Sequence, residues 1–144
     1  MKKIYRLLGI LVIAGAAIQF VPYGKDHTNP AVVAEPKWDS PRTKELFDRV
    51  CANCHSNNTV WPWYSSIAPV SWLIRHDVAD GRKHFNVSMW DAQKVNKGSG
   101  AADMVSEGEM PPWFYVIGHP EAKLSDSEKT QFVQGLSATF TAGK

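Results

Sequence analysis

The first 23 residues contain the longest apolar run of the chain. Three basic side chains precede this run: Lys2, Lys3 and Arg6. Residues 7–21 are then apolar apart from Gln19, so a helix here has no polar face with which to join a soluble fold. The run approaches the roughly 20 residues that a spanning helix needs. We therefore predict a membrane segment at 1–23 and favour a retained signal anchor; the alternative is a signal peptide cleaved near Ala14-Gly15-Ala16.

After this segment, helical periodicity begins only at residue 39. Residues 22–38 contain three prolines, one glycine and no helical period, which indicates a linker at 24–38. The first helix of the domain is expected at 39–54, with Ser40 as N-cap and Pro41 at the first helical position. Its apolar side chains share one face: Leu46, Phe47, Val50 and Cys54.

A second helix is predicted at 67–84. Ala68-Pro69 would open it, and Gly81 would mark its weakening or end. Its apolar stripe consists of Val70, Leu73, Ile74 and Val78. A short helix at 101–107 follows after a polar run.

The last helix is expected to begin at Ser125, because Ser125 and Glu128 have the spacing of a capping box. Its buried stripe would contain Phe132, Val133, Leu136 and Phe140. This helix is expected to pack against the helix at 39–54. The sequence has no internal repeat and no convincing strand pattern. The prediction is an all-α fold, with four or five short helices in one domain at 39–144.

The composition favours some binding partners of the domain over others. A hydrophobic content of 44% argues against disorder, and six tryptophans suit a small core that wraps a large, flat, apolar ligand. The formal charge of +2 depends on the N-terminal segment, because the rest of the chain has 13 basic and 14 acidic residues. No basic patch indicates nucleic acid, and no nucleic-acid partner is expected.

Both cysteines lie in one motif, Cys51-Ala52-Asn53-Cys54-His55. On one helical turn their thiols point to the same side and can add to the two vinyl groups of one porphyrin, while His55 offers a ring nitrogen to the iron. A thioredoxin-like dithiol would need a βαβ context, which these polar helical flanks lack. A zinc site would need a second ligand pair, and His76 and His84 lie eight residues apart with no further cysteine. The motif predicts one covalent haem c with its iron bound by His55.

A distal iron ligand is predicted in Gly108-Glu109-Met110-Pro111-Pro112. The two prolines favour an extended path at Met110, and Gly108 permits the bend before it. Met110 is therefore the expected sixth ligand. The rivals for that position are Met89, Met104, His76, His84, His119 and water.

Aromatic residues flank both motifs. In the loop at 56–66, the indole N–H groups of Trp61 or Trp63 would bond a haem propionate, unless these rings simply belong to the core. A second predicted loop at 113–123 would close the distal pocket with Trp113, Phe114 and Tyr115. Further propionate partners are expected on the second helix: Arg75, Arg82 and Lys83.

Further motifs extend along about 40–136: Ser56-Asn57 after the cysteine motif, Trp61-Pro62-Trp63-Tyr64-Ser65, Ile67-Ala68-Pro69-Val70-Ser71-Trp72, Asp77-Val78, Gly81-Arg82, Trp90, Met110-Pro111-Pro112 and His119-Pro120. With Cys51-x-x-Cys54-His55 they resemble the bacterial haem-binding domain family of short monohaem c-type cytochromes. The resemblance implies a cytochrome-c-like fold around one covalent haem, with His55 and Met110 as iron ligands.

The expected function is single-electron transfer rather than enzymatic catalysis, because His/Met ligation leaves no open iron position for a substrate. Redox partner proteins would meet an exposed porphyrin edge in a small, transient contact. The alternatives are a haem-based sensor or gas-binding module with a displaceable distal ligand, and a haem peroxidase. The basic N-terminus favours a cytoplasmic start. The domain is therefore expected on the periplasmic side of the inner membrane, anchored there or, after cleavage, free in the periplasm.

Overall fold

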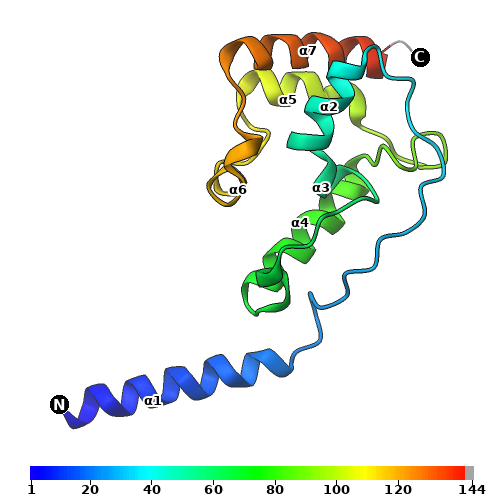
Figure 1. The fold of residues 1–144 in the computed structure, drawn as a ribbon. Coiled ribbons are helices and arrows are strands. Elements are labelled where there is room, and N and C mark those ends of the chain that lie inside the picture. Colours follow the sequence, from blue (N-terminus) through cyan, green and yellow to red (C-terminus); the bar gives the residue numbers. More distant parts are fainter. Residues whose placement is uncertain (142–144) are drawn as a thin grey trace.

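The structure, a computed structural model, describes residues 1–141, so the last three residues of the predicted domain at 39–144 lie outside the described residues. Residues 1–141 form seven α-helices and no strand, which confirms the all-α prediction (Figure 1). Helix α1 stands apart from the rest. Helices α2–α7 form the domain, and their number exceeds the predicted four or five because two short helices, α3 and α6, were not expected.

Helix α1 (Lys2–Ala17) continues as a 3-10 turn (Ile18–Phe20), and none of its residues is buried. Together they form a 19-residue helix that is long and apolar enough to cross a membrane. This is compatible with a membrane anchor and with a signal sequence. Figure 1 shows α1 projecting away from the helices of the domain.

Helix α2 (Pro41–Val50) begins as predicted, since the Ser40 side chain accepts a hydrogen bond from the Thr43 N–H at 3.2 Å and Pro41 is the first helical residue. The single helix predicted at 39–54 is interrupted. Cys51 leaves the helical conformation (φ −120°), and a separate turn, α3 (Ala52–His55), follows. The break lets the apolar face of α2 enter the core while α3 turns toward a neighbouring cavity.

Helix α4 (Val70–His84) passes through Gly81, so the prediction that the helix weakens there is wrong. A Cβ atom at Gly81 would lie 2.6 Å from the Cys54 carbonyl oxygen, which shows that glycine permits close packing of α4 on α3. The predicted apolar stripe is only partly buried. Val78 is buried, whereas Val70 and Leu73 near the start of α4 are exposed.

Helix α5 (Ala101–Glu107) has the predicted bounds and ends at Gly108, whose φ of +82° is left-handed. Helix α7 (Asp126–Thr141) begins with the predicted capping box: the Ser125 N–H donates to Glu128 Oε2 at 3.0 Å, and the Glu128 N–H donates to Ser125 Oγ at 3.3 Å. Gly135 of α7 lies against Thr43 of α2, which confirms the predicted packing of these two helices. Their apolar faces form the core together with α5: Leu46, Phe47, Val50, Val105, Phe132, Leu136 and Phe140.

The prediction of a loop at 113–123 is wrong. The first part of this segment is helix α6 (Trp113–Gly118), and a 3-10 turn follows (Pro120–Ala122). The extended Pro112 starts α6, and its carbonyl accepts hydrogen bonds from the Tyr115 and Val116 N–H groups at 3.0 and 3.2 Å. A tertiary contact holds the helix in place: the Asn53 side-chain amide donates to the Tyr115 hydroxyl at 2.8 Å.

The predicted linker at 24–38 lies along the domain in an extended conformation (Figure 1). The Val33 N–H donates to the Ser88 carbonyl at 2.9 Å, and Ala34 forms an isolated bridge with Met89. The Asn57 side-chain amide donates to the Ala31 carbonyl at 2.8 Å. We call residues 24–38 the strap, because these contacts hold the segment against the domain.

Candidate functional site

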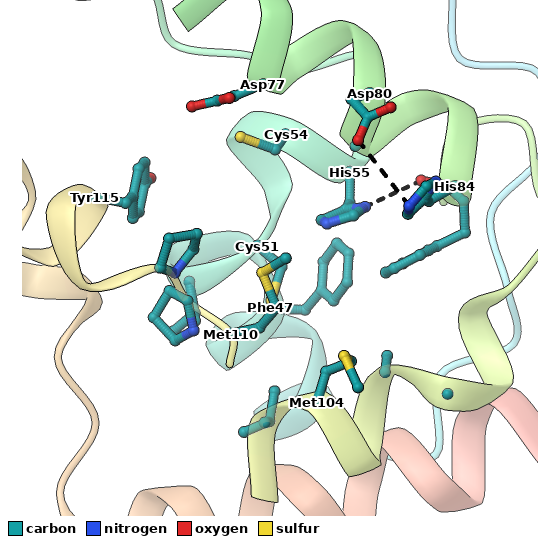
Figure 2. Close-up of a pocket in the computed structure, with 18 of the residues that line it drawn as sticks. Phe47, Cys51, Cys54, His55, Asp77, Asp80, His84, Met104, Met110 and Tyr115 are labelled. Carbon is teal, nitrogen blue, oxygen red and sulfur yellow. Dashed lines mark hydrogen bonds and ion pairs between the residues drawn. The ribbon is translucent and has the colours of Figure 1, made fainter. Parts of the chain in front are cut away.

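A cavity of about 430 Å³ opens between α2, α3, α4, α5 and α6 (Figure 2). This volume falls in the range of cavities that bind small molecules and cofactors. Its walls are mainly apolar: Phe47, Val50, Phe85, Ala101, Val105, Pro111, Pro112, Phe114 and Leu136. The four residues predicted to bind a cofactor also line it: Cys51, Cys54, His55 and Met110. The tertiary structure thus brings together two motifs that lie more than fifty residues apart in the sequence.

His55 is buried and held in one orientation. Its ring stacks on Phe85, with centroids 4.1 Å apart and planes 13° from parallel. Its Nδ1 lies 3.2 Å from the Phe85 carbonyl oxygen, which can only accept a hydrogen bond, so Nδ1 carries the hydrogen. Burial lowers the pKa of His55, which keeps the ring neutral. The lone pair on Nε2 is therefore available to a metal.

Burial raises the pKa of both thiols. The pKa of Cys54 rises to about 11, chiefly through desolvation and further through the Asp77 carboxylate, and desolvation also raises the pKa of Cys51. Both groups are therefore protonated at neutral pH. Dithiol oxidoreductases need the opposite, a thiol whose pKa is lowered so that the thiolate forms. The electrostatics of this site do not suit a thioredoxin-like active site.

Asn53, between the two cysteines, fixes α3 to its surroundings. Its side-chain oxygen accepts from the Val60 N–H at 2.9 Å, and its carbonyl accepts from the Thr59 hydroxyl at 2.7 Å. Its amide donates to the Tyr115 hydroxyl, as described above. Burial raises the pKa of Tyr115 to about 12, so the phenol that accepts this hydrogen bond is neutral at neutral pH. These contacts position the cysteine motif against α6 and the following loop.

Two thioethers, not one, reach the cavity. Met110 and Met104 both line it, and the Met110 N–H donates to the Met104 carbonyl at 3.1 Å. Figure 2 shows the Met104 side chain rising from α5 into the cavity, on the side opposite His55. Met89, the third predicted candidate, is bridged to Ala34 of the strap and does not line the cavity.

Only one of the three rival histidines lies at the cavity. His84 lines it and faces Asp80, with Nε2 4.0 Å from the carboxylate. His76 is exposed and lies 3.3 Å from the Asp77 carboxylate through its own Nδ1. His119 stacks on Tyr115 at 4.1 Å and donates through Nδ1 to the Tyr115 carbonyl at 3.2 Å. Neither His76 nor His119 lines the cavity.

The aromatic and cationic side chains predicted to contact the haem also differ in whether they line the cavity. Phe114 and Tyr115 line the cavity, whereas Trp113, Trp61 and Trp63 do not. Trp61 stacks on His27 of the strap, with ring centroids 4.6 Å apart. None of the cations expected on α4 lines the cavity: Arg75, Arg82 and Lys83.

Arg82 makes hydrogen bonds within the domain. Its Nε donates to the Ser56 carbonyl at 2.8 Å, and its guanidinium also donates to the Thr59 hydroxyl at 2.9 Å. The side chain thus secures the loop that follows the cysteine motif.

Sequence reasoning missed three polar residues of the cavity wall: Asp77, Asp80 and Lys97. Asp77, Asp80 and His84 recur at helical spacing, and Gly81 lies between them on the same face, so this periodicity was a usable signal. Lys97 comes from an irregular polar segment, where no local pattern indicates which side chain turns inward.

The donor set fits an iron porphyrin better than zinc. Among residues 1–141, no group of three or more His, Cys, Asp and Glu side chains is placed to hold a metal ion. The neutral imidazole of His55, two thiols and two thioethers around an apolar cavity are instead the kinds of group that hold an iron porphyrin.

Comparison with protein families gives one result that covers most of the chain. The model of a haem-binding domain family matches residues 13–138. Comparison with curated proteins and with solved structures found no match.

Proposed function

Because the chain belongs to the haem-binding domain family, we propose that it is a c-type cytochrome that binds one haem covalently and transfers single electrons. One observation carries the proposal. A neutral, fixed imidazole, His55, lines the same apolar cavity as two thiols and two thioethers. Family membership accounts for haem binding, and this arrangement supports the c-type attachment.

In this proposal each side chain has a defined role. Cys51 and Cys54 would each add sulfur to one carbon of a vinyl group and hydrogen to the other, so no oxidant is needed. His55 would supply Nε2 as the proximal ligand, oriented by its hydrogen bond to Phe85. Met110 would supply the distal thioether from a loop stiffened by Pro111 and Pro112.

Bound haem supplies a one-electron couple between Fe(III) and Fe(II). The protein would favour Fe(II), because a soft thioether and an apolar cavity both disfavour the extra charge of Fe(III). If His55 and Met110 both bind the iron, they would leave no position on it for a substrate, so we do not propose an enzymatic activity. Helix α1 would hold the domain on the periplasmic side of the inner membrane, where redox proteins are the proposed partners.

Replacing both cysteines tests the covalent attachment. The double variant Cys51→Ala with Cys54→Ala should lose the haem stain after denaturing electrophoresis, because haem held without a thioether bond dissociates there. The wild-type chain, produced in the same host with its c-type maturation machinery, is the control. A stain that persists in the double variant would contradict covalent attachment at this motif.

Replacing the methionines singly tests the distal ligand. In the oxidised protein, Met110→Ala should abolish the weak long-wavelength band of sulfur bound to iron, whereas Met104→Ala should keep it. Met89→Ala is the matched control, because Met89 lies outside the cavity. A band lost in Met104→Ala but kept in Met110→Ala would transfer the role to Met104. A high-spin wild-type spectrum with ready carbon monoxide binding would favour the sensor alternative.

A further inference from the structure

The start of α4 and the turn before it expose four large apolar side chains. Their exposed fractions are 80% for Trp63, 43% for Ile67, 43% for Val70 and 53% for Leu73. We call these four residues the apolar corner. Val70 and Leu73 are three residues apart in one helix and therefore share a face. Such a cluster next to a membrane segment is typical of a membrane or protein contact.

The apolar corner is tied to the end of α1. The Gln19 side-chain amide donates to the Ala68 carbonyl at 2.9 Å, and the Ala68 N–H donates back to the Gln19 side-chain oxygen at 3.0 Å. Five residues later, Gly24 packs so closely on Ser71 that a Cβ atom would lie 2.5 Å from the Ser71 carbonyl oxygen. The two contacts follow the same order in both segments, so the first turn of α4 runs beside the chain as it leaves α1.

These contacts set the depth of the corner. A 19-residue helix is about 28 Å long, close to the roughly 30 Å of a bilayer's hydrocarbon core. If α1 crosses the membrane, Gln19 lies near its outer boundary, and the backbone of Ala68 satisfies an amide that lipid cannot. The corner then lies at the same level, where tryptophan side chains are enriched.

We propose that the apolar corner inserts into the outer boundary of the bilayer that α1 crosses, so that the domain docks on lipid. This rests on the proposed anchor but not on haem. It has a consequence for the site, because Gly81 of the same helix packs against the Cys54 carbonyl. Docking α4 on the membrane would therefore fix the orientation of the cavity relative to the bilayer.

Photo-crosslinking of the full chain in nanodiscs of phosphatidylethanolamine and phosphatidylglycerol tests the proposal. Benzoylphenylalanine would replace Trp63, Leu73, Leu11 of α1 or, as control, Val95. Val95 is comparably exposed, at 57%, and belongs to the loop at 91–97, which lies away from the start of α4 (Figure 1). Lipid adducts detected by mass spectrometry are expected at positions 63, 73 and 11, and only background at 95.

Three results would overturn the proposal. Adducts at position 11 without adducts at 63 and 73 would mean that α1 is in the bilayer while the corner is not. Background at all four positions would remove the anchor as well. Protein adducts at 63 and 73 in native membranes, in place of lipid adducts, would make the corner a protein interface. The haem stain of each sample reports on the proposed function separately.

A second variant tests the role of Gln19. Gln19→Leu keeps the helix apolar but removes both hydrogen bonds to Ala68. The lipid adduct at position 73 should fall several-fold, while the adduct at position 11 stays unchanged. An unchanged yield at position 73 would show that the contact does not hold the corner at the membrane, and would contradict the depth argument.

Discussion

At the scale of single residues, Gly81 determines how closely α4 approaches the cysteine motif. Its missing side chain leaves room for the Cys54 carbonyl, and a Cβ atom would also lie 3.0 Å from the Cys54 Cβ. The nearest atom is backbone, which cannot rotate away as a long side chain can. Any larger residue at position 81 must push α3 and α4 apart.

We therefore expect Gly81→Ala to lower the free energy of unfolding by about 1–3 kcal/mol, the usual cost of overpacking. Urea denaturation followed by circular dichroism measures the change. Gly118→Ala is the control, because a Cβ atom there meets only the Tyr64 hydroxyl at an ordinary 3.5 Å. Equal effects of the two substitutions would contradict the close-packing argument.

At the scale of elements, one carboxylate joins the start of α7 to α2. Glu128 accepts hydrogen bonds from the Ser125 N–H within its own cap, and from Arg49 and Arg42 of α2 at 2.7 and 3.1 Å. The Ser125 backbone and the Arg49 guanidinium hold the pKa of Glu128 at about 2, below its ordinary 4.5. The ionised form is therefore the one that the folded state stabilises.

The stabilisation from Glu128 is present above pH 4.5 and is lost as the pH falls toward about 2. Glu128→Gln should accordingly lower the free energy of unfolding at neutral pH, and the difference from wild type should disappear between these two values. Urea denaturation across pH 2–7 measures it. Glu107→Gln, at an exposed position of α5, is the control and should change little at any pH. A constant difference for Glu128→Gln across the range would rule out this ionic contribution.

At the scale of the whole molecule, the strap joins parts of the chain that are distant in sequence. Asn57, two residues after His55, is buried, and its amide donates to Ala31 of the strap. Its side-chain oxygen accepts from the Asn86 amide at 2.7 Å, and its backbone N–H donates to the Ser88 hydroxyl at 2.9 Å. The strap, the loop that follows the cysteine motif and the segment after α4 thus share one hydrogen-bond network.

Asn57→Ala should release the strap, because it removes the donor to Ala31 and leaves the Asn86 amide unpaired. We expect a loss of about 1–3 kcal/mol in the free energy of unfolding, and faster hydrogen exchange at the Val33 N–H, which is bonded to the Ser88 carbonyl. Asn58→Ala, at the exposed neighbouring position, is the control. Unchanged exchange at Val33 in Asn57→Ala would show that the strap is held by other contacts.

Local sequence signals determined the helix starts and ends that depend on a few neighbouring residues. Ser40-Pro41, the Ser125–Glu128 capping box and the left-handed Gly108 all act within one helical turn, so they were predicted correctly. The spacing of Cys51, Cys54 and His55 along the chain is likewise a local feature, and so is the restriction that Pro111 and Pro112 place on the backbone at Met110. For these features the nearest residues supply the hydrogen-bond partners or the dihedral restriction.

Tertiary contacts decided the rest. Gly81, a helix end by local pattern, stays helical because α3 packs against it, and residues 113–118 become α6 with Tyr115 bonded to Asn53. Trp61 stacks on the strap, Met104 turns into the cavity beside Met110, and the first turns of α4 extend past the core with their apolar side chains exposed. Each outcome depends on a partner distant in sequence, and a periodic pattern shows that a face is apolar without showing what lies against it.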